Sequence, residues 1–313
     1  MKTALLFPGQ GSQTIGMGKE LFDNFAVARE VFNEVDDALS EKLSDLMFFG
    51  MQDKLTLTEN AQPAIMTVSI AAMRVLQKEY SFDIAKEASF VAGHSLGEYS
   101  ALCAINVLGL TETARLLRVR GLAMQRAVPA GGGAMAALIG ADYNMAEIIA
   151  KEAAGDEVCN IANDNANGQV VISGTKTAID RAVSIAKDKG VKRALLLDVS
   201  APFHCALMSP AAGVMADALS VATFNSPIIP VVTNVTAREE TNPEKLRELL
   251  VDQVTGMVRW RESMEYLAQQ GVTNIIEVGA GKVLSGLMKR IAPAITTHNI
   301  GMFADFEEFA KVA

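Results

Sequence analysis

The sequence predicts an α/β protein whose mostly parallel sheet is interrupted by a small inserted subdomain. Two observations support this. Over most of the 313 residues, apolar strand-like runs alternate with helical patterns, which is typical of a parallel sheet. From about Val128 to Ser200 the order changes to β-α-β-β-α-β, the split βαβ unit of ferredoxin-like domains. We therefore expect a large α/β subdomain over residues 1–127 and 201–313, and a small ferredoxin-like subdomain over 128–200.

The elements of the large subdomain follow from apolar runs, helical periodicity and the residues that end each pattern. Pro63 is compatible with a helix because it lies near the helix start, and Thr111 or Thr113 is a candidate cap for the next long helix. The predicted strands are 3–8, 89–93, 228–236 and 274–279, and the predicted helices are 61–79, 111–127, 243–254, 261–271 and 283–291.

The small subdomain begins after the flexible stretch "VPAGGG". Its strands are short apolar runs, and its two helices end at glycines, which are common helix terminators. The predicted order is strand 134–140, helix 145–155, strands 157–163 and 168–174, helix 176–190 and strand 192–200.

The composition is in the range of a soluble globular enzyme, with half of the residues apolar and a fifth charged. No apolar run approaches the ~20 residues that span a bilayer, and the few apolar residues before Pro8 predict a first strand rather than a signal peptide. Three cysteines without a C-x-x-C spacing indicate neither a disulfide framework nor a zinc site. We expect a cytoplasmic protein with reduced thiols. The net charge of −8 argues against a nucleic-acid partner.

Two glycine-rich loops fail as nucleotide-binding motifs. "GQGSQTIG" lacks the third glycine of G-x-G-x-x-G in register, and "GAGKVLSG" has Val283 where a P-loop needs Ser or Thr. Both stretches are better interpreted as turns. We therefore expect no nucleotide cofactor in these loops.

The stretch "FVAGHSLGEYSAL" carries the strongest catalytic signal. Ser95 lies in a G-x-S-x-G motif after a strand and before a helix, the arrangement of a nucleophile elbow. Gly93 and Gly97 allow a turn too tight for larger side chains, and this turn exposes the hydroxyl. The N–H of Leu96 can then stabilise an oxyanion. We predict that Ser95 is a nucleophile.

A serine nucleophile needs a base, and the chain has three histidines. His94 is adjacent to Ser95 but points away from it, since alternate strand positions face opposite sides. His298 lies in a strand-like segment, where a buried structural role is expected. His204 lies in "SAPFHCALMSPA", and it is the favoured base because no rival is better placed. Asp198, or a carbonyl oxygen, could orient it.

Arg120 shares a helical stripe with apolar residues at spacings of three and four. An arginine on such a stripe must find an anion, because an unpaired buried charge is very costly. One interpretation is a core salt bridge to Asp or Glu. The other is a guanidinium that binds a substrate carboxylate through two parallel hydrogen bonds.

Six segments occur together in one order, and the set resembles the malonyl-CoA:acyl carrier protein transacylases of bacterial fatty acid synthesis. The resemblance covers nearly the whole chain. Its segments are "FPGQGSQTIGMG", "GHSLGEYSAL", the Arg120–Gly121 pair, "NGQVVISG", "PFHCALMSPA" and "DQVTGMVRW".

The resemblance implies a role for each matching residue. Ser95 would carry the acyl group, His204 would be its general base, and Arg120 would bind the malonyl carboxylate. The backbone N–H groups of Gln10 and Leu96 would form the oxyanion hole. Gln253 would orient His204 through a carbonyl oxygen. The implied fold is an α/β-hydrolase-like core with a ferredoxin-like insertion. One departure is Phe203, where family members often carry Ser or Gly, so we expect a narrower entrance.

The implied reaction is ping-pong transfer of malonyl from malonyl-CoA to the phosphopantetheine thiol of acyl carrier protein, with no metal and no bound cofactor. We expect a monomer with no membrane partner. The acidic carrier would dock on basic residues, for which Lys187, Lys189, Lys192 and Arg193, or Lys289 and Arg290, are candidates. Two alternatives stay open: a serine esterase or thioesterase that uses water as acceptor, and a non-catalytic protein that docks acyl carriers.

Overall fold

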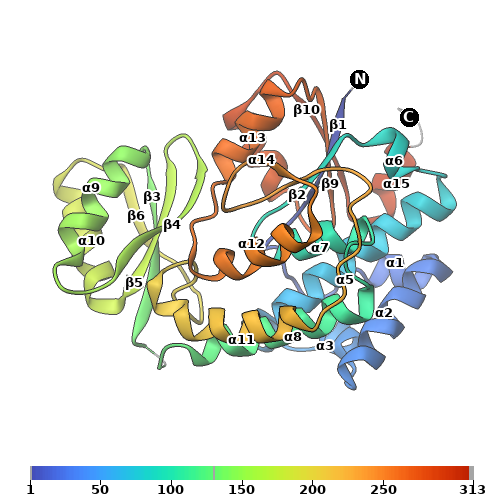
Figure 1. Cartoon of the computed structure of the whole chain (residues 1–313), viewed down its shortest axis with the longest axis horizontal. Helices are drawn as coiled ribbons and strands as arrows, with labels where there is room; N and C mark the ends of the chain where they lie inside the picture. Colours follow the sequence, from blue (N-terminus) through green and yellow to red (C-terminus); the bar gives the residue numbers. More distant parts are fainter. Residues whose placement is uncertain (1, 130, 310–313) are drawn as a thin grey trace.

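Two separate sheets organise the chain in the computed structural model, which describes residues 2–129 and 131–309 (Figure 1). The larger sheet has six strands in the order β10-β9-β1-β2-β7-β8. Its pairs are parallel except for β7–β8, so the predicted mostly parallel sheet is confirmed. The strands are β1 (Thr3–Phe7), β2 (Phe90–Gly93), β7 (Val231–Val232), β8 (Glu239–Glu240), β9 (Asn274–Val278) and β10 (Thr296–Ile300).

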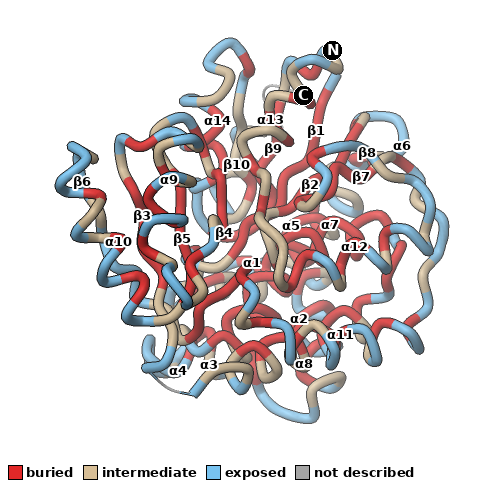
Figure 2. Tube along the Cα trace, turned by 60° about the vertical axis from the view of Figure 1, so that its left-hand side comes forward, coloured by how far each residue is buried: buried red, intermediate tan, exposed pale blue. Residues whose placement is uncertain are grey.

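Helices cover both faces of this sheet. All residues of β1 are buried, and because successive side chains of a strand point to opposite faces, both faces must be covered. Leu5 and Phe7 belong to the core under α5, α7 and α8, whereas Ala4 and Leu6 belong to the core under α13 and α14. The central strands are therefore buried, and so is most of α5, except in its last turn (Figure 2). These helices are α5 (Thr58–Glu79), α7 (Leu96–Ala104), α8 (Leu110–Arg126), α13 (Trp260–Gln269) and α14 (Val283–Ile291).

The smaller sheet is antiparallel, with the order β4-β5-β3-β6. One of its faces packs on α9 and α10, and its other face, including Met135 and Val171, joins the core of the larger part. The predicted β-α-β-β-α-β order is present. Its elements are β3 (Gly133–Ile139), α9 (Tyr143–Ala154), β4 (Cys159–Ala166), β5 (Gln169–Thr175), α10 (Lys176–Asp188) and β6 (Arg193–Leu196).

Backbone hydrogen bonds join β4 of the small sheet to the segment between α12 (Pro243–Thr255) and α13. Asp164 of β4 donates its N–H to the Val258 carbonyl at 3.0 Å, and the Val258 N–H donates to the Ala162 carbonyl at 2.8 Å. The buried carboxylate of Asp164 also pairs with Arg261 of α13 at 2.7 Å. These contacts fix the position of β4 beside the larger part.

The remaining helices surround the larger sheet (Figure 1). None of the helices in the described part of the chain is long and apolar enough to cross a membrane. They are α1 (Lys19–Asn24), α2 (Ala26–Leu39), α3 (Leu43–Phe49), α4 (Gln52–Thr56), α6 (Ile84–Glu87), the 3-10 helix η1 (Ala206–Met208), α11 (Ser209–Ser220), α12 (Pro243–Thr255) and α15 (Phe303–Phe309).

Three local predictions were wrong. Gly109 is the N-cap of α8, while Thr113 lies inside the helix and donates its hydroxyl to the Gly109 carbonyl at 2.8 Å. The strand predicted over 228–236 is reduced to β7, because Pro230 has no N–H and the Asn234 N–H is taken by a side chain. The last predicted strand of the small sheet ends at Leu196, since the Val199 N–H turns back to the Leu197 carbonyl.

Candidate active site

Ser95 lies in the turn between β2 and α7, at a backbone conformation of φ 55° and ψ −110°. Few residues other than glycine adopt a positive φ, so the turn is held against local strain. The flanking glycines are required by space. A Cβ on Gly93 would lie 1.9 Å from the Gly97 carbonyl carbon, and one on Gly97 would lie 2.2 Å from the Phe7 oxygen. The G-x-S-x-G motif thus forms the predicted elbow.

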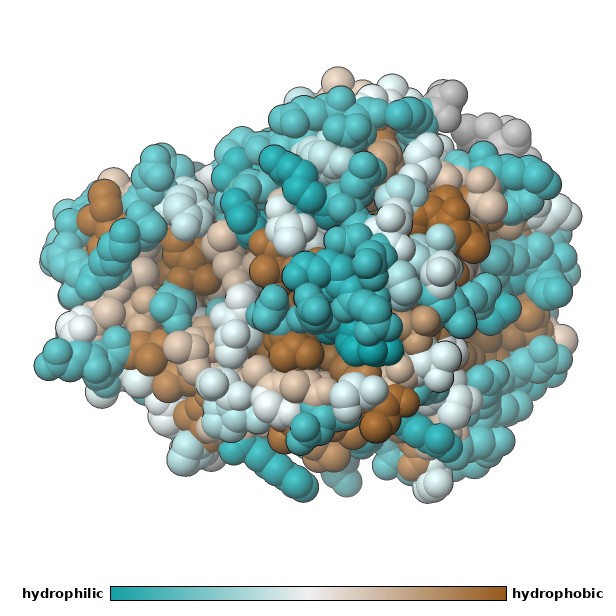
Figure 3. Space-filling view, viewed as in Figure 1, coloured by the Kyte–Doolittle hydropathy of each residue, from teal (hydrophilic) through white to brown (hydrophobic). Residues whose placement is uncertain are grey.

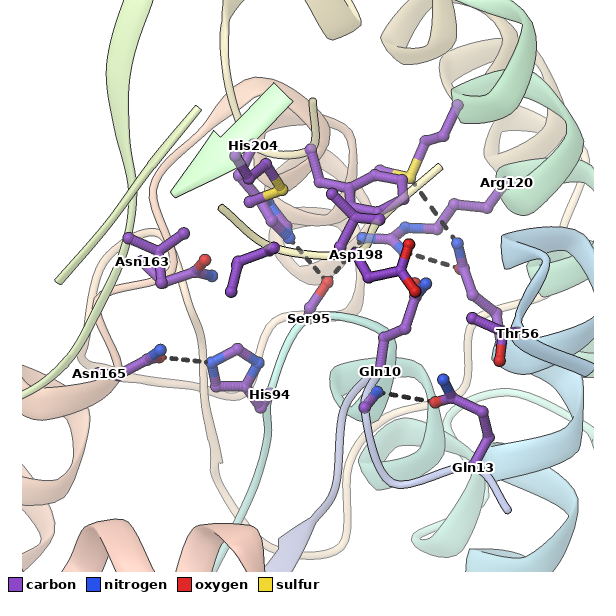
Figure 4. A pocket seen from close by; sticks show the side chains of 18 residues that line it. Gln10, Gln13, Thr56, His94, Ser95, Arg120, Asn163, Asn165, Asp198 and His204 are labelled. Carbon is purple, nitrogen blue, oxygen red and sulfur yellow. Dashed lines mark hydrogen bonds between the residues drawn. The ribbon is translucent and has the colours of Figure 1, made fainter. Parts of the chain in front are cut away.

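The imidazole of His204 contacts the Ser95 hydroxyl (Figure 4). The Ser95 Oγ and His204 Nε2 atoms are 2.8 Å apart. The Nδ1 of His204 donates to the Gln253 carbonyl at 2.9 Å and lies 3.2 Å from the Gly256 carbonyl. Because both of these partners only accept, the proton resides on Nδ1, and the lone pair of Nε2 faces Ser95.

The environment of His204 keeps its ring neutral. Burial, and after it the nearby positive charge of Arg120, lower the pKa of His204 from its ordinary value of 6.5 to about 3. The structure brings the predicted Gln253 carbonyl to the ring, whereas Asp198 is exposed, lines the cavity and forms no hydrogen bond or ion pair with His204 among the described residues. Asp198 is therefore not the orienting group.

Arg120 is 1% exposed and reaches the serine from α8. Its Nη2 donates to Ser95 Oγ at 3.2 Å and to Gln253 Oε1 at 2.9 Å, and its Nη1 donates to Gln62 Oε1 at 2.7 Å. None of the ion pairs between described residues includes Arg120, so the core salt bridge considered from the sequence is absent there. A buried cation with neutral partners beside the hydroxyl is suited to bind an anion.

Gln10 and Leu96 are both near the serine. Leu96 is the first residue of α7, and an N–H at this position has no acceptor within its own helix. Gln10 follows β1 and lines the same cavity as Ser95, while its side chain accepts from the Thr58 hydroxyl at 3.2 Å. The two residues thus lie shortly after the ends of two adjacent parallel strands, β1 and β2.

Sequence reasoning missed two buried residues behind the serine. Asn234 accepts from the Ser95 N–H at 2.7 Å and donates to the Gly93 carbonyl at 2.7 Å, so it holds both sides of the turn. Glu98, which is 0% exposed, accepts from the Asn234 N–H at 2.9 Å and from Gln253 Nε2 at 2.9 Å. The only signal for Asn234 was a polar residue just after an apolar run.

The other two histidines make different contacts. His94 donates from Nε2 to Asn165 Oδ1 at 2.8 Å and packs beside Trp260, so it does not serve Ser95 (Figure 4). His298 lies on the edge strand β10 and is half-buried rather than buried. His204 is thus the histidine that contacts Ser95.

A cavity of about 320 Å³ opens over Ser95, between the two sheets. Gln10, Ser95 and Arg120 lie on the side of the larger sheet. Met135 and Val171 line the opposite wall, and Phe203 lines the cavity next to His204; the narrower entrance stays a prediction. No group of three or more His, Cys, Asp or Glu side chains that could hold a metal is found among the described residues.

Known proteins resemble the chain over nearly its whole length. A family model described as an acyl transferase domain matches residues 4–292. The malonyl CoA-acyl carrier protein transacylase of Escherichia coli (strain K12) is 46% identical over 94% of both chains. The protein with the same name from Bacillus subtilis (strain 168) is 45% identical over 95% of this chain and 92% of its own.

Solved structures agree with these relatives. The acyl-carrier-protein-S-malonyltransferase from Bartonella henselae has a TM-score of 0.97 and 54% identity, covering 100% of this chain and 99% of its own. A malonyl-transacylase solved in complex with its type II PKS acyl-carrier protein has a TM-score of 0.96 and 40% identity, covering 100% of both chains.

Proposed function

Because the chain belongs to the family of acyl transferase domains, we propose that it transfers malonyl from malonyl-CoA to the phosphopantetheine thiol of acyl carrier protein through a malonyl ester of Ser95. The observation that carries this proposal is the buried guanidinium of Arg120, which lies 3.2 Å from the Ser95 hydroxyl and has no carboxylate in ion-pair contact among the described residues. A malonyl group brings the carboxylate that this cation lacks.

In the first half-reaction, His204 Nε2 takes the Ser95 proton as Oγ attacks the thioester carbonyl. The 2.8 Å contact between these atoms and the neutral ring suit this step. The negative charge on the carbonyl oxygen is stabilised by the N–H groups of Gln10 and Leu96. The C–S bond then breaks, and the coenzyme A sulfur leaves with the proton from His204.

The second half-reaction runs in reverse. His204 takes the proton of the carrier's thiol, and the sulfur attacks the malonyl ester. The bond to Ser95 Oγ breaks, and His204 returns the proton to this oxygen. Throughout, the Gln253 carbonyl holds the Nδ1 proton, so the ring keeps one orientation and one tautomer.

Hydrolysis by water is the competing reaction, and it defines the esterase or thioesterase alternative. Arg120 disfavours this alternative, because an esterase for uncharged acyl groups would leave a buried cation unpaired. The non-catalytic alternative is disfavoured by the Ser95–His204 contact and the neutral imidazole.

The finer architecture is part of the same proposal. We assign the larger part to an α/β-hydrolase-like subdomain over residues 1–127 and 201–313, and the four-stranded sheet to a ferredoxin-like subdomain over 128–200. The strand order β4-β5-β3-β6 and the serine turn after β2 support this division. The cytoplasmic location, the absence of a cofactor and the monomeric state stay predictions.

The carrier would dock beside the small sheet. Hydrophilic side chains cover most of the face in Figure 3, with apolar side chains in separate patches. Lys189 is paired with Glu152 at 2.8 Å, and Arg290 donates to Gln169 at 2.6 Å. Of the other candidates, Lys187, Lys192, Arg193 and Lys289, we favour Lys192 and Arg193 because of their position beside the cavity. Both are exposed at the start of β6, and the chain beyond β6 lines the cavity.

The experiment is intact mass spectrometry of the protein after mixing with malonyl-CoA, followed by addition of holo carrier protein. We expect one malonyl adduct, which then moves to the carrier faster than it hydrolyses. Ser95→Ala should give no adduct while keeping its fold, because the turn tolerates a smaller side chain. Adduct on Ser95→Ala, or loss of the adduct to water alone, would contradict the proposal.

A further inference from the structure

Glu98 is a buried carboxylate that the proposed reaction does not use. It is the third residue of α7 and is 0% exposed. A glutamate at this helix position usually accepts from the N–H of the N-cap residue, here Ser95. In this protein Asn234 Oδ1 takes the Ser95 N–H at 2.7 Å, and Glu98 Oε2 accepts instead from the Asn234 N–H. Glu98 therefore reaches the serine turn through Asn234.

The same carboxylate oxygen sets the direction of the Gln253 amide. Gln253 Nε2 donates to Glu98 Oε2 at 2.9 Å and to the Ser95 carbonyl at 3.1 Å, while Gln253 Oε1 accepts from Arg120 Nη2 at 2.9 Å. In the reversed amide, an oxygen would face the carboxylate and an NH₂ group would face the guanidinium. Both contacts would be repulsive, so the pair of charges permits one orientation.

This orientation matters for Arg120. Its Nη2 is shared between Gln253 Oε1 and Ser95 Oγ, and its other recorded acceptor is Gln62. If the Gln253 amide turned over, Arg120 would lose one of its two amide acceptors and face a donor. The guanidinium would then move away from the position that puts it 3.2 Å from the hydroxyl.

We propose that Glu98 is a positioning residue for acyl transfer, which orients Arg120 through the Gln253 amide and fixes the Ser95 turn through Asn234. The inference rests on the proposed function, because its readout is the choice of the malonyl group. It adds a residue that touches neither the serine nor the substrate carboxylate.

The ionised form of Glu98 is the one that accepts both hydrogen bonds without competition. Burial raises the pKa of Glu98 to about 7, although the Asn234 N–H, the Gln253 amide and Arg120 all favour the charge. Measurements at pH 8 therefore report on the carboxylate form.

The test compares Glu98→Gln with wild type at pH 8, using malonyl-CoA and acetyl-CoA as donors. The kcat/KM for malonyl-CoA should fall by about 10- to 100-fold, the range for losing hydrogen bonds to a charged group. The ratio of malonyl to acetyl transfer should fall as well, because acetyl does not use Arg120. An unchanged ratio would overturn the proposal, whatever happens to the thermal stability.

Glu277→Gln is the matched control. Glu277 is also 0% exposed and accepts from the N–H groups of Leu284 and Ser285 at 3.0 and 2.8 Å, but it lies on β9 and caps the start of α14, away from the serine turn. This variant should lose stability without changing the malonyl-to-acetyl ratio. If it lowers the ratio as much as Glu98→Gln does, a general effect of neutralising buried glutamates explains both, and the proposal fails.

A double variant tests the route through Gln253. Gln253→Met keeps the carbonyl that holds His204 but removes the side-chain amide. Adding Glu98→Gln to Gln253→Met should change the ratio no further, because the connection is already lost. If the effects of the two substitutions on the ratio are fully additive, Glu98 does not act through the Gln253 amide. Failure of wild type itself to form a malonyl adduct would contradict the proposed function instead, so the two failures are distinguishable.

Discussion

The two sheets of this protein contribute different things to one cavity. The larger sheet and its helices provide Ser95, Leu96, Gln10, Arg120 and Gln253. The small sheet provides a wall, and its edge strand β6 is largely exposed. The candidate reacting groups are thus fixed in a part whose sheet is buried on both faces, while β6, where we propose that the carrier docks, is largely exposed (Figure 2). The comparison indicates that chemistry and carrier recognition can be altered separately.

Loss of the base should give the largest effect on the chemical side. His204→Ala should slow acylation by ~10²–10⁴, the range for a lost general base. Malonyl-enzyme formation in rapid-quench experiments measures this rate. The slowing should be equal for transfer to the carrier and to a small pantetheine thiol, because the base serves both. A fall of the acylation rate by less than tenfold would indicate that another residue is the base.

Loss of the Arg120 cation should give the second largest effect, and it should change which acyl group is transferred. Arg120→Ala should raise the activation free energy of malonyl transfer by ~3–5 kcal/mol, the range for removing one partner of a buried ion pair. Acetyl transfer should be much less affected, because acetyl has no anion. The measurement is kcat/KM for malonyl-CoA and acetyl-CoA in both proteins. Arg120→Lys should recover only part of the loss, since lysine lacks the planar fork. An unchanged ratio of malonyl to acetyl transfer would indicate that Arg120 has only a structural role.

A change on the small sheet should act on the carrier alone. Lys192→Glu with Arg193→Glu should raise the KM for the carrier by about 3- to 10-fold, since each exposed ion pair contributes ~0.2–1 kcal/mol. The KM for malonyl-CoA should stay the same. Lys78→Glu with Lys86→Glu is the control, with the same charge change on exposed residues of α5 and α6. Equal effects on the KM values of the carrier and of malonyl-CoA would contradict the separate roles of the two sheets.

The smallest effect concerns stability and pH. The folded-state pKa of His204, about 3, lies below the ordinary value of 6.5. Between these values the unfolded chain binds more protons at His204, so the contribution of His204 to the free energy of unfolding falls as the pH drops through 6.5. This contribution should fall by about 1.4 kcal/mol between pH 7.5 and pH 5.5. Glu98, whose pKa is raised to about 7, acts in the opposite direction over this range, so the measurement is the difference between wild type and His204→Gln in urea unfolding at the two pH values. An equal change in both proteins would contradict the buried, neutral ring.

The sequence predicted the parts of the site that depend on local geometry. Gly93 and Gly97 are required by a tight turn, and such a requirement is visible in the residues themselves. The stripe of Arg120 predicted a buried cation, and burial is confirmed. The residue-based reasoning left both a carboxylate and a carbonyl open for His204, and only the family resemblance favoured Gln253.

The parts that were missed depend on long-range packing. Glu98 at the third position of a helix reads as an ordinary capping residue, and only the passage of α12 over it creates the buried contact with Gln253, 155 residues away. Asn234 fell inside a predicted strand of nine residues, although its N–H is taken by Glu98. Neither contact leaves a periodic pattern, because each depends on which elements become neighbours.

The unpaired Arg120 also bears on which form of the enzyme accumulates between turnovers. In the empty protein the guanidinium is buried among amide and hydroxyl oxygens, and a malonyl ester on Ser95 would supply the missing negative charge. The ion pair between Arg120 and the malonyl carboxylate would stabilise the malonyl-enzyme relative to the enzyme without the ester. We therefore expect the loaded protein to be the resting state, a small reservoir of activated malonyl that waits for a carrier.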